Sequence, residues 1–404
     1  MSLPSLVKEI SDGLQRKQSA HVAALLAITY DNQSPKAFRE NDRAVESACR
    51  NVFRGPGEPY GDIVIGLLKA KRFVYEEKYV LGYEEYIAGF IKFLEVFREE
   101  SNWLAPWLHV MVYDARILAL HADKEVSQKK GGGEIHDNVK NAEQHLKRAF
   151  SMTVNDRAPA ELSKKPATLY IVNQLFKIYF HLNAINLCRN LIRAIELQDF
   201  NRFVKRDQVT YQYYLGRIFM YEDQYHKAEE CLEYAWRHCH SKYKRNKRQI
   251  LQFLVPVKLI LGVMPSQALL QTYSLDEFLG ISRAIQQGNI RDFNQSLDKF
   301  QDQFVLQGVY LLMEKLRPIV MRNLLKKVHF VRDKKHQLKL VDFQVAIDVV
   351  DGTEMAMDAV ESLVANLIFK GYVKGYISHK LKVLVLSKSM PFPPITDVIK
   401  DRAL

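Results

Sequence analysis

Apolar residues recur with helical spacing over the first three quarters of the chain. The spacing i, i+3, i+4, i+7 is typical of an amphipathic helix. Residues 107–122 and 168–197 show this period. Two segments, 55–62 (GPGEPYGD) and 129–134 (KKGGGE), are too rich in glycine or proline to continue a helix, and we expect loops there. The clearest stripe, in residues 84–99, is formed by Ile87, Phe90, Ile91, Leu94 and Phe97.

A shorter pattern, Ala-x3-Leu-x2-Ala, repeats inside these helices. Leu215, Gly216 and Phe219 precede its last copy, where a tetratricopeptide-type helix pair has its Leu-Gly pair and its aromatic residue. Small residues let two helices approach closely, and large ones fill the groove between them. The copies are 45 and then 41 residues apart, more than the tetratricopeptide period of about 34, so the pattern predicts a looser array of helical hairpins. The three copies are Ala142, Leu146 and Ala149; Leu187, Leu191 and Ala194, with one substitution; and Ala228, Leu232 and Ala235.

The pattern changes after residue 336. Residues 338–341 resemble a short strand that leads into a helix, and a turn follows with Thr353 as the expected N-cap. We expect the next helix over residues 354–370, ended by Gly371. Two strands joined around residues 378–380 come next, with period-two alternation. Strand, helix, turn, helix and β-hairpin is the order of a winged helix.

These patterns predict an all-α array of tetratricopeptide-like helical hairpins followed by a C-terminal winged helix with a small antiparallel sheet. We place N-terminal helical repeats in residues 1–205 and a second domain in residues 206–388. In the second domain, repeats (206–308) continue without a linker into the winged helix (309–388). The proline-rich residues 389–404 are expected to form an extended tail.

The charge balance favours an acidic partner. The chain has 58 Lys and Arg against 46 Asp and Glu, a net charge of +12, which suits nucleic acid or an acidic protein. Four cysteines without a C-x-x-C pair suggest a reducing compartment. The start of the chain is too charged for a signal peptide, and the most apolar stretch, 250–264, is shorter than the roughly 20 residues of a spanning helix. We therefore expect no membrane association.

Basic residues are concentrated in two places. The first is the run 242–248, with no acidic residue between Trp236 and Arg248. It suits phosphates, an acidic protein or a nuclear import signal, although a solvated face would have the same composition. The second is the winged helix, where residues 309–388 hold 14 Lys or Arg and 8 Asp or Glu. The candidate residues for binding nucleic acid or an acidic partner are Lys242, Lys244, Arg245, Lys247, Arg248, Arg332, Lys334, Lys335, Lys370, Lys374, Lys380 and Lys382.

The last helix of the winged helix is not expected to read bases. Glu354, Asp358 and Glu361 follow one another at i, i+4 and i+7 and would face phosphates. Nucleic acid would then be bound by the wing and the basic flank, through its backbone and with low sequence specificity. The domain could also serve only to pack against another domain of its kind, and both roles can hold together.

Motifs for catalysis and for metal binding are missing from the sequence. The glycine-rich loops lack the G-K-[ST] ending of a phosphate-binding loop, and no G-x-S-x-G or H-E-x-x-H pattern occurs. Cys231, His238, Cys239 and His240 lie close in sequence without the spacing of a zinc site. We expect no enzyme activity, metal, cofactor or small-molecule substrate. The alternative is a nuclease or an RNA-modifying enzyme, because a site assembled only in space leaves no sequence pattern.

The array that runs into a winged helix resembles the PCI domain of proteasome-lid, COP9-signalosome and translation-initiation subunits. A Gly-Asn pair stands where such domains turn between helices of the last repeat. The residues that carry the resemblance are Leu279, Ile285, Gly288, Asn289, Ile290, Phe293, Leu297, Phe304, Gly308, Val309, Tyr310, Leu316, Arg317 and Asn323.

Within this family the whole chain resembles the proteins that act in mRNA export at the nuclear pore. That resemblance implies a non-catalytic scaffold in the nucleus, and possible presence in the cytoplasm. It implies two protein partners: a large GANP-type export scaffold with a PCI-like region, and a small, acidic, disordered subunit shared with the proteasome lid. It also implies RNA or DNA binding by paired winged helices. The alternative is a COP9-signalosome or proteasome-lid type scaffold with no nucleic-acid role.

Overall fold

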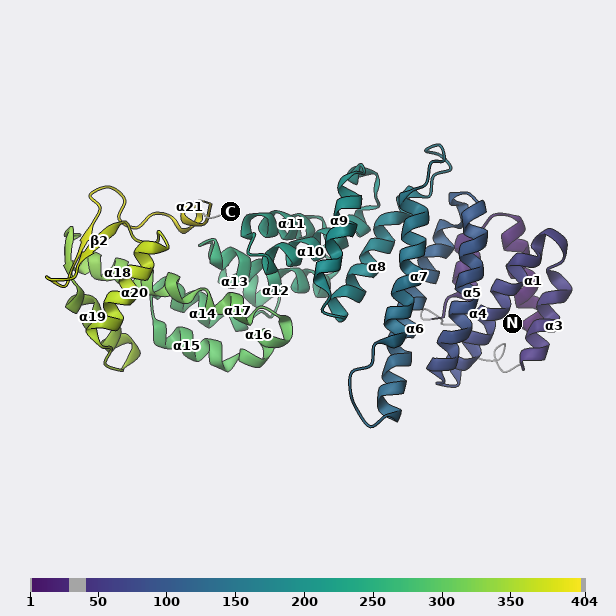
Figure 1. Cartoon of the computed structure of the whole chain (residues 1–404), viewed down its shortest axis with the longest axis horizontal. Helices are drawn as coiled ribbons and strands as arrows, with labels where there is room; N and C mark the ends of the chain where they lie inside the picture. The colour runs from purple at the N-terminus through teal and green to yellow at the C-terminus, as the bar shows by residue number, and fades with distance from the viewer. Residues whose placement is uncertain (1, 29–40, 401–404) are drawn as a thin grey trace. The chain divides into compact units, whose positions relative to one another are not determined.

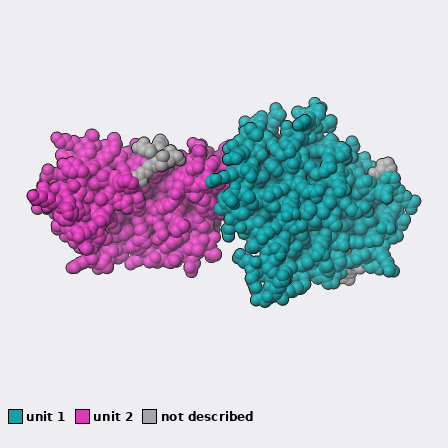
Figure 2. Space-filling view, viewed as in Figure 1, with its two compact units in different colours: residues 1–211 teal, residues 212–404 magenta. Residues whose placement is uncertain are grey.

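The computed structural model describes residues 2–28 and 41–400. The chain divides into two compact units, residues 1–211 and 212–404, and the division falls within helix α10 (Lys205–Tyr221) (Figure 2). Each unit has a hydrophobic core of its own.

Unit 1 is built from helices that pack against their neighbours in sequence (Figure 1). Helices α4 and α5 are held close together by glycines, since a Cβ atom on Gly66 would lie 3.2 Å from the Cα of Gly89. Phe90, Leu94 and Phe97 of the predicted stripe are buried, which confirms the amphipathic helix. The helices are α1 (Leu3–Gln15), α2 (Ser19–Leu26), α3 (Asp42–Val52), α4 (Glu58–Tyr75), α5 (Tyr79–Glu99), α6 (Ala105–Lys129), α7 (Asp137–Val154), α8 (Thr168–His181) and α9 (Cys188–Glu196).

The two predicted loops have different outcomes. Helix α6 ends at Lys129, and the glycines that follow it all have positive φ, so the second loop is confirmed. The first prediction is wrong over most of its length, because α4 begins at Glu58. Pro59 lies in the first turn of that helix, where a backbone N–H has no intrahelical acceptor and proline is therefore tolerated.

Unit 2 continues the helical hairpins and carries the sheet. Its core is one contiguous cluster from Met220 to Val398, so the repeats and the winged helix share a core. The remaining helices and the strands are α11 (Tyr225–His238), α12 (Lys244–Ile260), α13 (Gln267–Thr272), α14 (Glu277–Gln287), α15 (Ile290–Lys299), α16 (Gln301–Gln307), α17 (Tyr310–Glu314), α18 (Arg317–Val331), β1 (Gln337–Lys339), α19 (Leu340–Asp351), α20 (Met357–Phe369), β2 (Gly375–Ser378), β3 (Val383–Leu386) and α21 (Ile395–Lys400).

The repeat pattern is confirmed for its two complete copies. All six of their alanines and leucines are fully buried. A Cβ atom on Gly216 of α10 would lie 2.6 Å from the Leu232 side chain of α11, so this glycine permits the close approach of the two helices. The prediction from the substituted copy is wrong, because Leu187 is 39% exposed and lies in a 3-10 turn before α9.

The Gly-Asn pair joins α14 to α15 as expected. Gly288 has φ of 64°, which glycine adopts without strain. A Cβ atom there would lie 2.5 Å from the backbone nitrogen of Leu324 in α18. Asn289 caps α15 by accepting a hydrogen bond from the Asp292 N–H at 3.0 Å. The pair therefore sets both the turn and the distance between the last repeat and the winged helix.

The winged helix has the predicted order of elements, with three differences in detail. The first strand ends at Lys339 rather than at residue 341, because α19 already begins at Leu340. Thr353 does not cap the second helix, because α20 begins only at Met357 and the Thr353 hydroxyl bonds to the Asp351 carboxylate at 2.8 Å. The tail is not wholly extended, because residues 395–400 form α21; residues 401–404 lie outside the described part. The predicted fold class, helical repeats followed by a winged helix with a small antiparallel sheet, is confirmed.

Candidate nucleic-acid interface

The sheet of the winged helix presents one face to the core and one to solvent. Strand β3 lies between β1 and β2 and is antiparallel to both. The core face carries Leu338, Leu384 and Leu386, which are buried. The opposite face, here called the outer sheet face, consists of two rows set by the strand register. The rows are Gln337, Val385 and Tyr376, and Lys339, Val383 and Ser378.

Four exposed lysines gather at one end of this sheet. Because β1 and β2 both run antiparallel to β3, the starts of β1 and β2 meet at the end of β3. Backbone pairing extends to this point, since the N–H of Ser387 donates to the Lys374 carbonyl at 2.8 Å. The four residues, here called the basic sheet end, are Lys334, Lys335, Lys374 and Lys388.

Two contributors to this surface were not among the predicted site residues. Lys388 follows β3, and Lys339 lies on the outer sheet face. The signal that could have found them is the pairing register, because it shows which strand ends share an edge. The carboxylate nearest to these lysines in sequence is Asp333, which is exposed in the turn before β1. The basic sheet end therefore keeps an excess of positive charge.

The wing holds a second group of predicted residues, and part of its charge is offset. Lys380 is exposed at the turn between β2 and β3. Lys382 donates to the Glu361 carboxylate at 2.6 Å and lies 3.5 Å from that of Asp358. Hydrogen bonds from Lys382 and then from His379 hold the pKa of Glu361 below its usual value, and the same bond raises the pKa of Lys382. The acidic residues of α20 thus neutralise the wing lysine beside them.

Other predicted residues of the winged helix lie apart from the sheet end or are already paired. Arg332 forms an ion pair with Asp342 of α19. Lys370 is half-buried and lines a cavity of about 800 Å³ together with Lys315 and Tyr372. This cavity lies where α18 and α20 meet the turn between α10 and α11, so its wall is not part of the sheet end.

The basic run 242–248 divides into exposed and structural residues. Lys242 is exposed in the turn between α11 and α12, and Lys244 and Arg245 are exposed in the first turn of α12. Lys247 is only 9% exposed; its ammonium donates to the Trp236 carbonyl at 2.8 Å and lies 4.0 Å from the centre of the Trp236 ring.

Arg248 is also held within the fold. Its guanidinium donates to the backbone carbonyls of Tyr273 and Ser274, both at 3.2 Å. Three of the five basic residues in the run therefore remain accessible to a partner. In Figure 1 the labels of α11 and α12 lie well away from the sheet within unit 2, so the run 242–248 and the basic sheet end form two separate basic surfaces.

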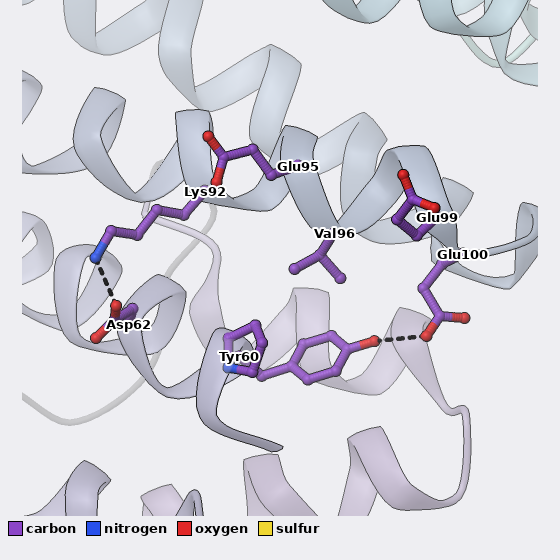
Figure 3. A pocket seen from close by; sticks show the side chains of 8 residues that line it. Tyr60, Asp62, Lys92, Glu95, Val96, Glu99 and Glu100 are labelled. Atoms are coloured by element: carbon purple, nitrogen blue, oxygen red, sulfur yellow. Dashed lines mark hydrogen bonds and ion pairs between the residues drawn. The ribbon is translucent and has the colours of Figure 1, made fainter. Parts of the chain in front are cut away.

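Unit 1 offers a groove of the opposite charge. The groove has a volume of about 480 Å³ between α4 and α5, and Glu95, Glu99 and Glu100 line it (Figure 3). Asp62 is paired with Lys92 at 2.7 Å, and the Tyr60 hydroxyl donates to Glu100 at 3.2 Å. The carboxylates of Glu95 and Glu99 on this face repel phosphates, so the groove is not a candidate for nucleic acid.

Residues 2–28 and 41–400 contain neither a candidate metal site nor a candidate membrane-spanning helix. No group of three or more His, Cys, Asp or Glu side chains there is arranged to hold a metal ion. Cys231 and Cys239 carry thiols whose pKa is raised by burial. None of the described helices combines the length and apolar character of a bilayer-crossing segment.

Comparison with known proteins identifies the family. Residues 297–388 match the PCI domain model, and residues 139–280 match a model described as PSMD3-like, N-terminal TPR repeats. "PCI domain-containing protein 2" of Danio rerio is 34% identical over 98% of this chain and 99% of the relative. The Xenopus laevis protein of the same name is 35% identical with the same coverage. "Protein CSN12 homolog" of Neurospora crassa is 34% identical over 72% of each chain. The chain therefore belongs to the PCI-domain family and is a PCI scaffold of the PCI domain-containing protein 2 group.

Proposed function

We propose that this chain is a non-catalytic adaptor that binds the backbone of nucleic acid through the basic sheet end of its winged helix. The observation that carries the proposal is the gathering of Lys334, Lys335, Lys374 and Lys388 at one end of a sheet whose outer face has no carboxylate in its two rows. Lysines arranged in this way attract phosphates without distinguishing bases. The exposed carboxylate of Asp358 on α20, with a side chain 92% exposed, favours this surface over insertion of the helix into a groove.

The proposal predicts binding that weakens steeply with salt. Each phosphate contact on a single strand contributes about −0.7 to the slope of log K against log salt concentration. Replacing Lys335, Lys374 and Lys388 with alanine should therefore make the slope less negative by about 2. Fluorescence anisotropy with a labelled RNA over a salt series measures both the slope and the affinity.

The matched control replaces three lysines that are exposed in unit 1, Lys8, Lys124 and Lys130. It removes the same net charge from the chain. If both triple variants lose affinity equally, the effect is one of overall charge, and the basic sheet end is not the site. If neither variant changes the slope, nucleic acid is not bound by this winged helix.

We further propose that the adaptor works in a nuclear mRNA-export complex at the nuclear pore. Its partners would be a large GANP-type scaffold with a PCI-like region and a small, acidic, disordered subunit. Membership in the PCI domain-containing protein 2 group supports this assignment. The exposed residues Lys242, Lys244 and Arg245 suit the acidic subunit. Co-purification of both partners with the tagged chain, and nuclear-rim localisation, test it.

A second candidate function is a COP9-signalosome type scaffold without a nucleic-acid role. The relative named "Protein CSN12 homolog" favours it. The same RNA titration separates the two functions. Absence of RNA binding by the chain, alone and with its scaffold partner, would leave the second candidate.

A further inference from the structure

The outer sheet face carries one large aromatic side chain among its basic and small residues. Tyr376 is 63% exposed in the middle of β2. The register places it opposite Val385 of β3, whose side chain is only partly covered. Lys374 directly precedes β2, and its carbonyl still pairs with the N–H of Ser387. At the usual rise per residue of an extended chain it is about 7 Å from Tyr376. The exposed ring and the lysine are therefore close enough to contact a base and a neighbouring phosphate of the same strand.

The polar neighbours of this ring suit a base. Gln337 stands in the same row as Tyr376, with Val385 between them, and its exposed amide can donate and accept hydrogen bonds. Ser378 follows Tyr376 by two residues and belongs to the next row with Val383 and Lys339. Aromatic rings beside cationic side chains are the usual means by which proteins hold unpaired bases.

We propose that the outer sheet face binds single-stranded nucleic acid, with one unpaired base stacked on the ring of Tyr376 and the adjoining phosphates held by Lys374 and the rest of the basic sheet end. This inference rests on the proposed function and adds the class of substrate. In a duplex the two faces of each base are covered by its neighbours, so Tyr376 can contribute only when the strand is unpaired. The face therefore selects single strands over duplexes without selecting a base sequence.

The test compares a single-stranded RNA and a duplex of the same length, by anisotropy with the full-length chain. Stacking on one aromatic residue is worth about 5- to 150-fold in affinity. Tyr376→Ala should lose this factor on the single strand and leave duplex binding unchanged. Tyr376→Phe, which keeps the ring, should bind like the unaltered chain. Tyr75→Ala removes a tyrosine that is 49% exposed in unit 1 and serves as the matched control.

The outcomes separate this inference from the proposed function. If the lysine variants weaken binding and Tyr376→Ala does not, phosphates are bound at the sheet end but no base stacks, and the inference fails alone. The inference is also overturned if Tyr376→Ala lowers the affinity for the single strand and for the duplex by the same factor. If neither the lysine nor the tyrosine variants change binding, both proposals fail.

Discussion

Lys247 provides the sharpest test of the division between structural and accessible lysines. Lys247→Met keeps the aliphatic stem and removes the ammonium that bonds to the Trp236 carbonyl at 2.8 Å and lies over the Trp236 ring. We expect this change to loosen the packing of α11 against α12. It should have no direct effect on nucleic acid, because the residue is buried.

The magnitude follows from the two interactions. A hydrogen bond from a charged group contributes about 1.5–3 kcal/mol, and a cation–π pair contributes about 0.5–2 kcal/mol. One ammonium makes both, so the values do not add, and we expect a loss of about 2–3 kcal/mol in local stability. This corresponds to local opening that is about 30- to 150-fold more frequent.

Hydrogen-exchange mass spectrometry of peptides from α11 and α12 measures this opening directly. The matched control is Lys244→Met, in the first turn of the same helix, where the side chain is exposed. The control should leave exchange unchanged, since surface substitutions usually alter stability by less than about 0.5 kcal/mol. Equal protection in both variants would refute the reasoning. Charge reversal across the run should therefore be confined to Lys242, Lys244 and Arg245.

Three other perturbations test packing and burial. Gly216→Ala should destabilise unit 2 by about 1–3 kcal/mol because of the clash with Leu232. In urea unfolding, the double variant Gly216→Ala with Leu232→Ala should lose less unfolding free energy than the two single variants lose together. Burial lowers the pKa of Lys177 to about 8. Since the charged form is then disfavoured in the folded state, Lys177→Met should raise the melting temperature most below pH 8, and the gain should fade as the pH rises past the ordinary lysine pKa. Arg322 donates to the backbone carbonyls of Phe392 and Pro393 at 3.2 and 2.8 Å; Arg322→Met should therefore release the tail and speed its cleavage in limited proteolysis.

The fold class could be predicted from sequence because it depends on local periodicity. The stripe around Phe90 and the triplet around Leu232 each lie within one helix, where a spacing of three or four residues specifies a face. The errors fall where local patterns are ambiguous. Pro59 suggested a loop, but in the first turn of a helix proline is compatible with the fold. Leu187 matched the triplet by composition, although its segment does not continue the helix.

The candidate site was less predictable because its charge depends on pairing between distant segments. Lys247 and Lys244 look alike in sequence, and only the position of Trp236 distinguishes a buried ammonium from an exposed one. Lys382 lies 21 residues from Glu361, with which it pairs. The sequence does not point to Lys388, because no local pattern links the end of β3 to the start of β1.

The arrangement of charges also explains why low sequence specificity is expected. Within the winged helix, Glu361 and Asp342 offset the cations next to α20 and α19, while the lysines at the basic sheet end have no comparable partner in the described residues. The positive charge is therefore concentrated at an edge formed by strand ends. Of the predicted acidic row, Glu354 lies before α20 and Glu361 is paired with Lys382, so the helix that could enter a major groove exposes the carboxylate of Asp358. An edge of this kind contacts phosphates, whose spacing is common to all sequences. In the binding mode proposed here, discrimination comes from whether the nucleic acid is single-stranded, because stacking on Tyr376 requires an unpaired base.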